Sequence, residues 1–355
     1  MKVLITAPSL DENSNVSGIS TMVRNLIESR RFDFSHFEAG RRDGEAADAA
    51  WFGKQAMLPF RFFARIKIED PAIVHINTAF IPLAIVRDVS LAAAAKLARK
   101  PVVLHVHGGP FVMEKITSTA LKTAVRSLLR LTKVTVVFSD RERHALESNF
   151  PVTNIRVLPN GIQVDKALTN ERVSGREKTF IFFGRLHPSK GLEHIVAACR
   201  VLTEQGFKFR YVCYGAGPEL ESFVTQMNNI LGERFSYRGI ARFDQKHHAL
   251  AEADIFFQPS RDEGLPLALL EAMSAGCVPV MSESGAVGDV IKDGYNGFLI
   301  DANDTLQTIG KLKVLLTDGN KRWHELRTNA VETVRTKFSF DRFMDGLAKI
   351  YNEIK

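Results

Sequence analysis

The sequence has few cysteines and no apolar run long enough to cross a membrane. Its three cysteines, Cys199, Cys213 and Cys277, are widely spaced and form no Cys-x-x-Cys pair. This favours a reducing compartment and argues against a disulfide scaffold or a zinc site. No stretch approaches the about 18 consecutive apolar residues of a membrane-spanning helix. The apolar start of the chain is stopped by Pro8, too early for a signal-peptide core. These absences predict a cytoplasmic protein, unless another feature takes it to a surface.

The composition is that of a soluble globular protein. Apolar residues make up 45% and charged residues 25% of the 355 residues, which excludes a disordered chain and a collagen-like fibre. The length predicts two domains. The chain contains no short internal repeat and no low-complexity tract.

The excess of positive charge is confined to the first half of the chain. Residues 1–170 hold 23 basic and 16 acidic side chains, whereas residues 171–355 hold 24 of each. A basic domain attracts nucleic acid, anionic lipid or phosphorylated substrates, and it also simply keeps a protein soluble. The sequence has neither a zinc finger nor an aromatic RNA-binding motif, so we expect no nucleic-acid partner.

Two basic segments suggest a contact with an anionic membrane. Lys122, Arg126, Arg130 and Lys133 follow helical spacing beside an apolar stripe, as in a basic amphipathic helix. In residues 59–68, aromatic side chains alternate with cations. Either segment could rest peripherally on the inner face of the plasma membrane. The alternative is a surface helix whose apolar side packs on the core of its own domain.

Short apolar strands alternate with longer amphipathic helices along the whole chain, which predicts buried parallel sheets. We expect two Rossmann-like, doubly wound α/β domains that face each other across a cleft. Residues 1–164 form the first, 165–178 a polar linker and 179–338 the second, and a C-terminal helix over 339–355 crosses back to the first. The predicted strands of the first series are Lys2–Thr6, Ile73–Ile76, Val102–His107, Val134–Phe138 and Ile155–Leu158. Those of the second are Thr179–Phe183, Phe209–Tyr214, Phe235–Tyr237, Ile255–Gln258, Val278–Met281 and Gly297–Ile300.

The strongest motif runs from Asp262 to Met273, directly after an apolar strand. Glu263 and Glu271 are separated by seven residues, and Pro266 fits the first turn of a helix. Glu263 then lies in the loop ahead of the helix and Glu271 inside it. The amides at the start of this helix suit phosphate or sugar oxygens, and the carboxylates suit sugar hydroxyls. The simpler interpretation is a capped helix with a solvated glutamate.

Two cations follow the first strand of the second domain. Arg185 and Lys190 precede a helix, where fixed positive charges suit a diphosphate. They could replace a metal ion in stabilising a departing nucleotide diphosphate, and the chain has no Asp-x-Asp pair. The alternative is a pair of surface cations at a helix start.

Three further elements are weaker. His105 and His107 end a predicted strand with His107 at its carboxyl edge, and a metal site there lacks a third ligand. Ser17-Gly18-Ile19-Ser20 forms a small-residue turn ahead of a helix, where backbone amides can approach a phosphate. The segment from Tyr214 to Leu220 opens like a dinucleotide fingerprint, but Leu220 occupies the third glycine position.

Together these segments resemble the retaining glycosyltransferases of family four, which have the GT-B fold. The resemblance covers most of the chain, and bacterial capsule, exopolysaccharide and O-antigen enzymes often show a similar Glu-Gly-Leu-Pro-Leu segment. Its markers are Ser17-Gly18-Ile19, His107-Gly108-Gly109, Pro159-Asn160-Gly161, Gly184-Arg185 with Lys190, Gly215-Ala216-Gly217-Pro218, and Glu263 with Glu271.

The resemblance implies a role for each matching residue. Arg185 and Lys190 would bind the donor diphosphate and stabilise the leaving group. Glu263 would bind the transferred sugar near its 3-hydroxyl, and Glu271 the ribose hydroxyls. Gly18 would approach the diphosphate, and His107 would contact the 6-position of the sugar near the anomeric centre. The turn Arg238-Gly239-Ile240 would receive the base. The backbone of Gly264, Leu265 and Leu267 would contact the sugar and the phosphate.

Three departures from the family pattern affect the donor site. Ser17 stands where many relatives have glycine, Pro266 donates no N–H, and Asp289 stands where a glutamate is usual.

The resemblance implies a retaining hexosyltransferase that needs no cofactor and no metal. It would move a sugar from a nucleotide-sugar donor, UDP favoured, to a glycan or polyprenyl-diphosphate-linked acceptor in bacterial surface polysaccharide synthesis. Two other functions fit the same motifs. A nucleotide-sugar epimerase would convert the donor without an acceptor, and a non-catalytic binding protein would neither transfer nor hydrolyse it.

Overall fold

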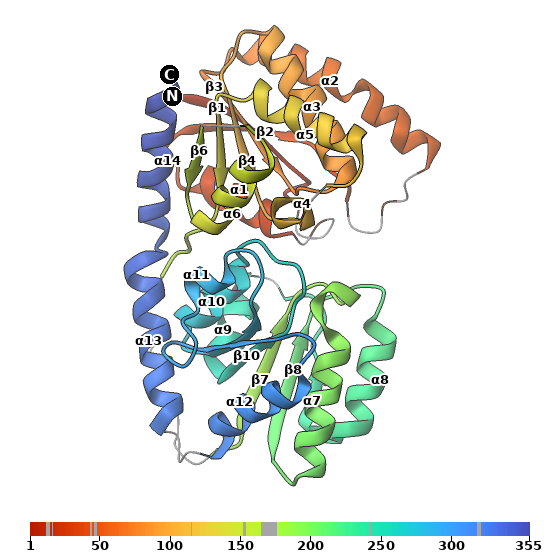
Figure 1. Ribbon diagram of the computed structural model, residues 1–355, viewed down its shortest axis with the longest axis vertical. Helices are drawn as coiled ribbons and strands as arrows, with labels where there is room; N and C mark the ends of the chain where they lie inside the picture. Colours follow the sequence, from red (N-terminus) through yellow and green to blue (C-terminus); the bar gives the residue numbers. More distant parts are fainter. Residues whose placement is uncertain are drawn as a thin grey trace. The chain divides into compact units, whose positions relative to one another are not determined.

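The chain folds into two α/β units. The computed structural model describes residues 1–11, 15, 17–42, 45, 48–114, 116–151, 154–164, 176–241, 243–317 and 321–355. One unit comprises Met1–Pro159 with Met344–Lys355, and the other comprises Asn160–Phe343. Each contains a six-stranded parallel sheet with helices on its faces (Figure 1), so the predicted pair of doubly wound domains is confirmed.

The division between the units lies before residue 160, earlier than the predicted end of the first domain at 164. Ile162 pairs with Ser339 in an isolated parallel bridge, and its amide donates to the Phe338 carbonyl at 3.0 Å. These bonds attach residues 160–164 to the second unit. Residues 165–175 of the predicted linker lie outside the described residues, and its last residue, Lys178, is the first of a strand.

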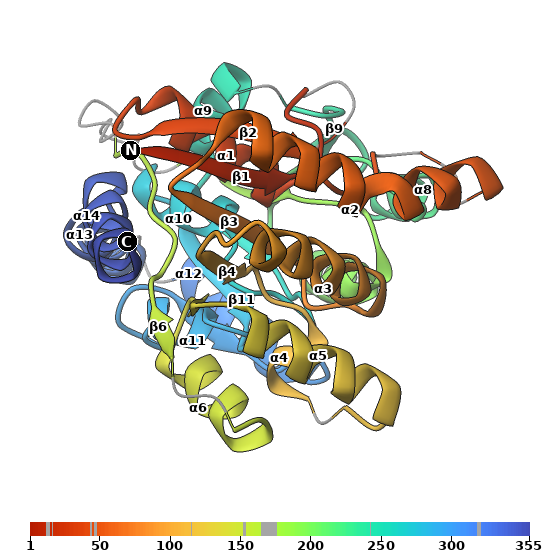
Figure 2. The same ribbon diagram turned by 90° about the horizontal axis from the view of Figure 1, so that it is seen from above.

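The sheet of the first unit has the order β2-β1-β3-β4-β5-β6. Its apolar strands are buried, as parallel strands covered on both faces must be. Helices α2, α3 and α5 lie side by side on one face (Figures 1 and 2). The bounds are β1 Lys2–Ala7, α1 Gly18–Glu28, β2 Asp33–Glu38, α2 Ala49–Glu69, β3 Ile73–Thr78, α3 Pro82–Leu97, β4 Val102–Val106, α4 Pro110–Met113, α5 Thr119–Leu131, β5 Val134–Val137, α6 Asp140–Asn149, β6 Ile155–Val157 and α14 Phe340–Ile354.

Strand β2 and helix α2 are among the elements of this unit that were not predicted. Strand β2 has the sequence DFSHFE, and only Phe37 in it is fully buried, so it lacks the continuous apolar run of its neighbours. Residues 59–68, singled out for alternating rings and cations, belong to the long helix α2. Leu58, Phe62 and Ile66 bury one side of that helix, whereas Phe60 is 69% exposed.

The sheet of the second unit has the order β12-β11-β10-β7-β8-β9. Its core joins strand residues such as Phe180 and Phe257 to helix residues such as Ile195 and Trp323. The bounds are β7 Lys178–Phe183, η2 Pro188–Lys190, α7 Leu192–Glu204, β8 Phe209–Tyr214, α8 Leu220–Leu231, η3 Gly232–Arg234, β9 Phe235–Tyr237, α9 Phe243–Glu252, β10 Ile255–Gln258, α10 Leu267–Ser274, β11 Val278–Ser282, α11 Val287–Val290, β12 Phe298–Ile300, α12 Thr305–Thr317 and α13 Lys321–Lys337.

None of the helices in the described ranges combines the length and the apolarity that crossing a membrane requires.

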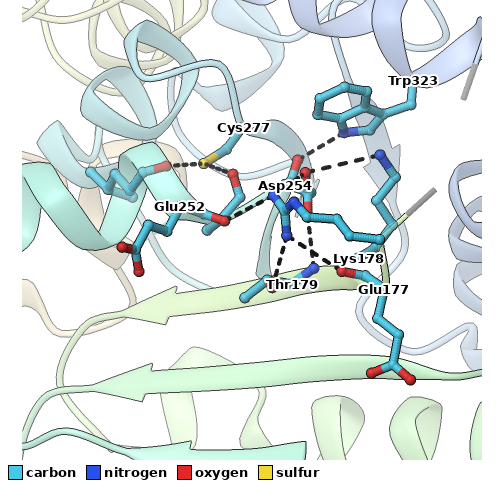
Figure 3. Close-up of polar contacts among 10 residues, drawn as sticks. Glu177, Lys178, Thr179, Glu252, Asp254, Cys277 and Trp323 are labelled. Carbon is cyan, nitrogen blue, oxygen red and sulfur yellow. Dashed lines mark hydrogen bonds and ion pairs between the residues drawn. The ribbon is translucent and has the colours of Figure 1, made fainter. Parts of the chain in front are cut away.

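A buried aspartate joins the starts of β7 and β10 to α13. Asp254 is 1% exposed, and its carboxylate accepts from the Thr179 amide at 2.9 Å and from Arg176 Nη2 at 2.9 Å. The Trp323 indole donates to the Asp254 carbonyl at 3.0 Å, and Lys178 Nζ lies 3.5 Å from the centre of the Trp323 ring (Figure 3). A buried charge is tolerated only when it is paired and hydrogen-bonded in this way.

Replacing this carboxylate should destabilise the second unit. Asp254→Ala leaves Arg176 and the Thr179 amide without their acceptor, and we expect a loss of about 3–5 kcal/mol in the free energy of unfolding. The exposed pair of Arg335 with Glu332 provides the control, because Glu332→Ala should change stability by less than about 1 kcal/mol. Urea unfolding of both variants measures the difference. Equal stability of the two variants would contradict the structural role given to Asp254.

Candidate functional site

The second unit gathers charged side chains beyond the carboxyl ends of its strands, where ligands bind in open α/β sheets. Lys190 ends the short helix η2 that follows β7, and Glu263 lies in the loop after β10. Lys190 Nζ is 2.6 Å from Glu263 Oε1, and the two side chains are 19% and 10% exposed. Gln258, the last residue of β10, also donates to Glu263 Oε1 at 2.8 Å. The structure therefore brings together two residues that the sequence singled out, and adds Gln258 to them.

The second glutamate of the motif has a cationic partner that the sequence did not indicate. Glu271 lies in the second turn of α10 and forms an ion pair with Lys246 of α9. Their side chains are 10% and 23% exposed. Lys246 Nζ is also 5.7 Å from the ring centre of Phe183, which ends β7. No spacing rule relates Lys246 to Glu271, because only the packing of α9 against α10 brings them together.

The helix that carries Glu271 begins one residue later than predicted. Pro266 is its N-cap, with φ −64° and ψ 126°, and not a residue of its first turn. The first-turn amides are therefore those of Leu267 and the residues after it. Leu265 is 4% exposed, and its carbonyl accepts from Asn160 Nδ2 at 2.8 Å. Gly264 is fixed in turn, since its carbonyl accepts from the Ala286 amide at 2.9 Å.

The loops at this edge are packed so closely that side chains are excluded at specific glycines. Gly285 has φ +49°, and a Cβ there would lie 2.1 Å from the Glu263 carbonyl oxygen. At Gly191, directly after Lys190, a Cβ would lie 2.1 Å from the Pro259 carbonyl oxygen. Backbone contact therefore sets the positions of the Lys190 turn and the Glu263 loop.

Arg185 and the predicted base-binding turn lie at the same edge, on the loops after β7 and β9, with the loop after β8 between them. Arg185 is an exposed residue directly after Gly184. The turn at Arg238 follows β9, and the Arg238 amide donates to the Cys213 carbonyl at 3.0 Å. Gly239 has φ +73°, and its carbonyl accepts from the Gly215 amide at 2.8 Å. Ile240 is 49% exposed, so the turn presents an apolar side chain to solvent. Asp289 is exposed on α11.

In the first unit, His107 follows the last residue of β4 and is held by a buried asparagine. Asn77 of β3 is 3% exposed, and its Oδ1 lies 2.7 Å from His107 Nε2. The His105 ring is centred 4.3 Å from that of His107. Burial lowers the pKa of His107 to about 3, and His75 adds to the shift. Within the described residues, no group of three His, Cys, Asp or Glu side chains is arranged to hold a metal ion.

The small-residue turn of the first unit caps helix α1. The Ser17 hydroxyl accepts from the Ser20 amide at 3.1 Å, as an N-cap should. Gly18 is the first residue of the helix, and a Cβ there would meet no atom within 4 Å. Ser17 thus serves as a helix cap, a role that the sequence motif did not indicate.

The predicted cationic stripe is only partly helical. Lys122, Arg126 and Arg130 lie on α5, whereas Lys133 follows the helix and its amide donates to the Val102 carbonyl at 2.8 Å. Arg126 and Arg130 are exposed. The apolar side of α5, with Val125, Leu128 and Leu129, belongs to the core of the unit. Any membrane contact of α5 must therefore rest on its charges.

Family profiles match both halves of the chain. The profile "Glycosyltransferase Family 4" matches residues 16–166, and "Glycosyl transferases group 1" matches residues 165–335. A relative from Escherichia coli, the UDP-Gal:alpha-D-GlcNAc-diphosphoundecaprenol alpha-1,3-galactosyltransferase, is 28% identical over 73% of this chain and 70% of its own length.

Solved structures share the fold across the whole chain. Sucrose-phosphate synthase from Thermosynechococcus elongatus matches with a TM-score of 0.80 at 16% identity. The match covers 99% of this chain and 98% of the synthase chain. The Anabaena protein HepE, solved with UDP, matches with a TM-score of 0.74 at 16% identity. The match covers 99% of this chain and 100% of the HepE chain. Both likenesses establish the two-domain GT-B fold.

The close packing around Glu263 gives a direct test of the loop geometry. Gly285→Ala adds left-handed strain and pushes a Cβ into the Glu263 carbonyl, so we expect it to cost about 2–4 kcal/mol of unfolding free energy. Gly206 is the control, because it has φ +83° but nothing within 4 Å of a Cβ. Gly206→Ala should cost only the strain, about 1–2 kcal/mol. Urea unfolding compares them, and an equal loss in both variants would contradict the contact assigned to Gly285.

Proposed function

Since the chain belongs to family four of the glycosyltransferases, we propose that it transfers a hexose, with retention and without a metal ion, from a UDP-sugar to a glycan acceptor. The observation that carries the proposal is the pairing of Lys190 with Glu263 and of Lys246 with Glu271 at one sheet edge. These side chains supply cations for a diphosphate and carboxylates for hydroxyls, which are the two chemistries of a nucleotide sugar.

Lys190 and Arg185 are assigned to the donor diphosphate. Glu263 neutralises Lys190, with 2.6 Å between Lys190 Nζ and Glu263 Oε1. A diphosphate brings the anions that this ammonium prefers, and Glu263 then becomes available to a sugar hydroxyl while Gln258 still holds it. As the glycosidic bond breaks, negative charge grows on the leaving diphosphate, and fixed cations stabilise it most at that point. They provide the charge that a metal ion would otherwise supply.

The nucleoside end of the donor is assigned to the neighbouring loops. Glu271 would accept from the ribose hydroxyls, and the turn of Arg238, Gly239 and Ile240 would receive the base. The backbone of Gly264, Leu265 and Leu267 would contact the sugar and phosphate, and Gly18 of the first unit the diphosphate. Uridine is favoured because the galactosyltransferase relative is named for UDP-Gal and HepE was solved with UDP.

Retention is proposed to follow a front-face displacement. Glu263 stays held by Gln258 when Lys190 turns to the diphosphate, so we assign it to sugar binding and not to covalent attack. The acceptor hydroxyl forms the new bond to the anomeric carbon on the face from which the diphosphate departs. A donor phosphate oxygen takes the hydroxyl proton, which leaves a nucleoside diphosphate and the extended glycan. His107 would lie beside the transferred sugar.

The acceptor is proposed to be a polyprenyl-diphosphate-linked glycan of a bacterial surface polysaccharide. The galactosyltransferase relative is named for a diphosphoundecaprenol-linked substrate. The exposed Arg126 and Arg130 of α5, with Lys122 beside them, would hold the first unit on an anionic membrane face.

Removing either key side chain should abolish transfer without unfolding the protein. Lys190→Ala deprives the leaving group of a cation and Glu271→Ala deprives the ribose of its acceptor, so we expect kcat/KM to fall at least about 100-fold. Lys208→Ala and Glu204→Ala, near the opposite edge of the same sheet, should retain activity. Radiolabelled transfer and thermal unfolding test the four variants. Full activity in either purified, folded site variant would overturn the assignment, and donor conversion without an acceptor would indicate an epimerase.

Charge reversal on α5 should weaken binding to anionic vesicles. Each basic residue near such a surface contributes about 1 kcal/mol, so Arg126→Glu with Arg130→Glu should reduce binding more than about tenfold. Sedimentation with phosphatidylglycerol vesicles measures it. The same reversal at the exposed Lys321 and Lys337 of the second unit is the control for net charge. Unchanged binding of the α5 variant would contradict a membrane contact through this helix.

A further inference from the structure

A buried polar chain crosses three strands of the first sheet and ends at His107. Thr6 of β1 is 0% exposed and Asn77 of β3 is 3% exposed. The Asn77 amide N–H donates to Thr6 Oγ1 at 3.1 Å, and the Asn77 side chain bonds both Thr6 and His107. Since β1, β3 and β4 are neighbours in the sheet, the strand ladder fixes the asparagine from both sides.

The contact with Thr6 determines the orientation of the Asn77 side-chain amide. Asn77 Nδ2 is 2.7 Å from the Thr6 carbonyl oxygen, and a carbonyl oxygen can only accept. The NH₂ group must therefore face Thr6. The other end of the amide, Oδ1, then faces His107 Nε2 at 2.7 Å. Because Oδ1 can only accept, His107 Nε2 must carry a hydrogen.

The surroundings of His107 also keep its ring neutral. Its pKa is lowered to about 3 by burial and by His75, and the rings of His105 and Phe138 are centred 4.3 Å and 5.4 Å away. A neutral imidazole has one N–H. With that hydrogen on Nε2, Nδ1 holds a lone pair and can only accept.

We propose that Asn77 is a positioning residue that holds His107 as the neutral Nε2–H tautomer and thereby presents Nδ1 as a hydrogen-bond acceptor to the substrate. This inference rests on the proposed function for the identity of that substrate. At the 6-position of the transferred sugar, such an acceptor selects a hydroxyl, which can donate. It disfavours a carboxylate, which at neutral pH can only accept. Asn77 would therefore make the site one for hexoses and not for hexuronates.

The tautomer can be measured without any activity assay. In protein labelled with ¹⁵N at histidine, long-range ¹H–¹⁵N correlation at pH 7 should show a protonated Nε2 and an unprotonated Nδ1 for His107. The spectrum of His107→Gln identifies the signals. A protonated Nδ1, or two protonated nitrogens, would overturn the proposal whatever reaction the protein catalyses.

Kinetics test whether Asn77 acts through His107. Asn77→Ala should give exchange between both tautomers in the spectrum and lower kcat/KM about tenfold, the loss of about one hydrogen bond. Tyr351→Phe is the control. This substitution removes a different buried hydrogen bond, the one between Tyr351 Oη and His75 Nδ1 of β3 at 2.5 Å. It should leave the His107 signals and kcat/KM unchanged.

Two results separate failure of this inference from failure of the proposed function. If His107→Gln loses activity while Asn77→Ala keeps both the activity and the single tautomer, Asn77 is not a positioning residue. If both variants transfer sugar as well as the unaltered protein, His107 has no role in the reaction and its proposed place beside the sugar is wrong. In that case the link to the substrate fails too, even where the spectrum shows the expected tautomer.

Discussion

The candidate donor site depends on close contact between backbones at the carboxyl edge of the second sheet. A Cβ at Gly215 would lie 1.8 Å from the Gly184 carbonyl oxygen, and one at Gly285 would lie 2.1 Å from that of Glu263. Loops that touch backbone to backbone have little freedom to move. Side chains carried by such loops are therefore placed before a ligand arrives, and preorganisation of this kind makes fixed charges effective.

Charge pairing stabilises this edge of the second unit. Lys190 is paired with Glu263 and Lys246 with Glu271, and all four side chains are at least three-quarters covered. A partly buried charge without a partner would be costly. Under the proposed function, a nucleotide sugar replaces these internal partners with phosphate oxygens and hydroxyls. The binding energy then comes from an exchange of partners, and the desolvation of the side chains has largely occurred on folding.

The sequence predicted the fold well wherever a local pattern decides it. Strands such as Phe209–Tyr214 and Ile255–Gln258 have the predicted bounds, because buried parallel strands leave clear apolar runs in the sequence. Strand β2 was missed because four of its six side chains are polar. Helix α2 was missed because Pro59 and its exposed rings break the usual helical pattern.

The partners of the site residues could not be predicted in the same way. Lys246 meets Glu271 and Asn77 meets His107 only through tertiary packing, across 25 and 30 positions of the sequence. Two separate motifs predicted Lys190 and Glu263 as site residues, but the packing decides that they form an ion pair. Sequence motifs thus indicate which chemistry is available, and the fold decides which groups hold it in place.

The most direct test of the central claim is a thermal-shift and hydrolysis screen of nucleotide sugars in the presence of EDTA. We expect a UDP-sugar to raise the melting temperature and to be slowly hydrolysed under these conditions, because Arg185 and Lys190 provide the positive charge. If no nucleotide sugar binds, or if binding requires a divalent cation, the roles assigned to these two residues are wrong.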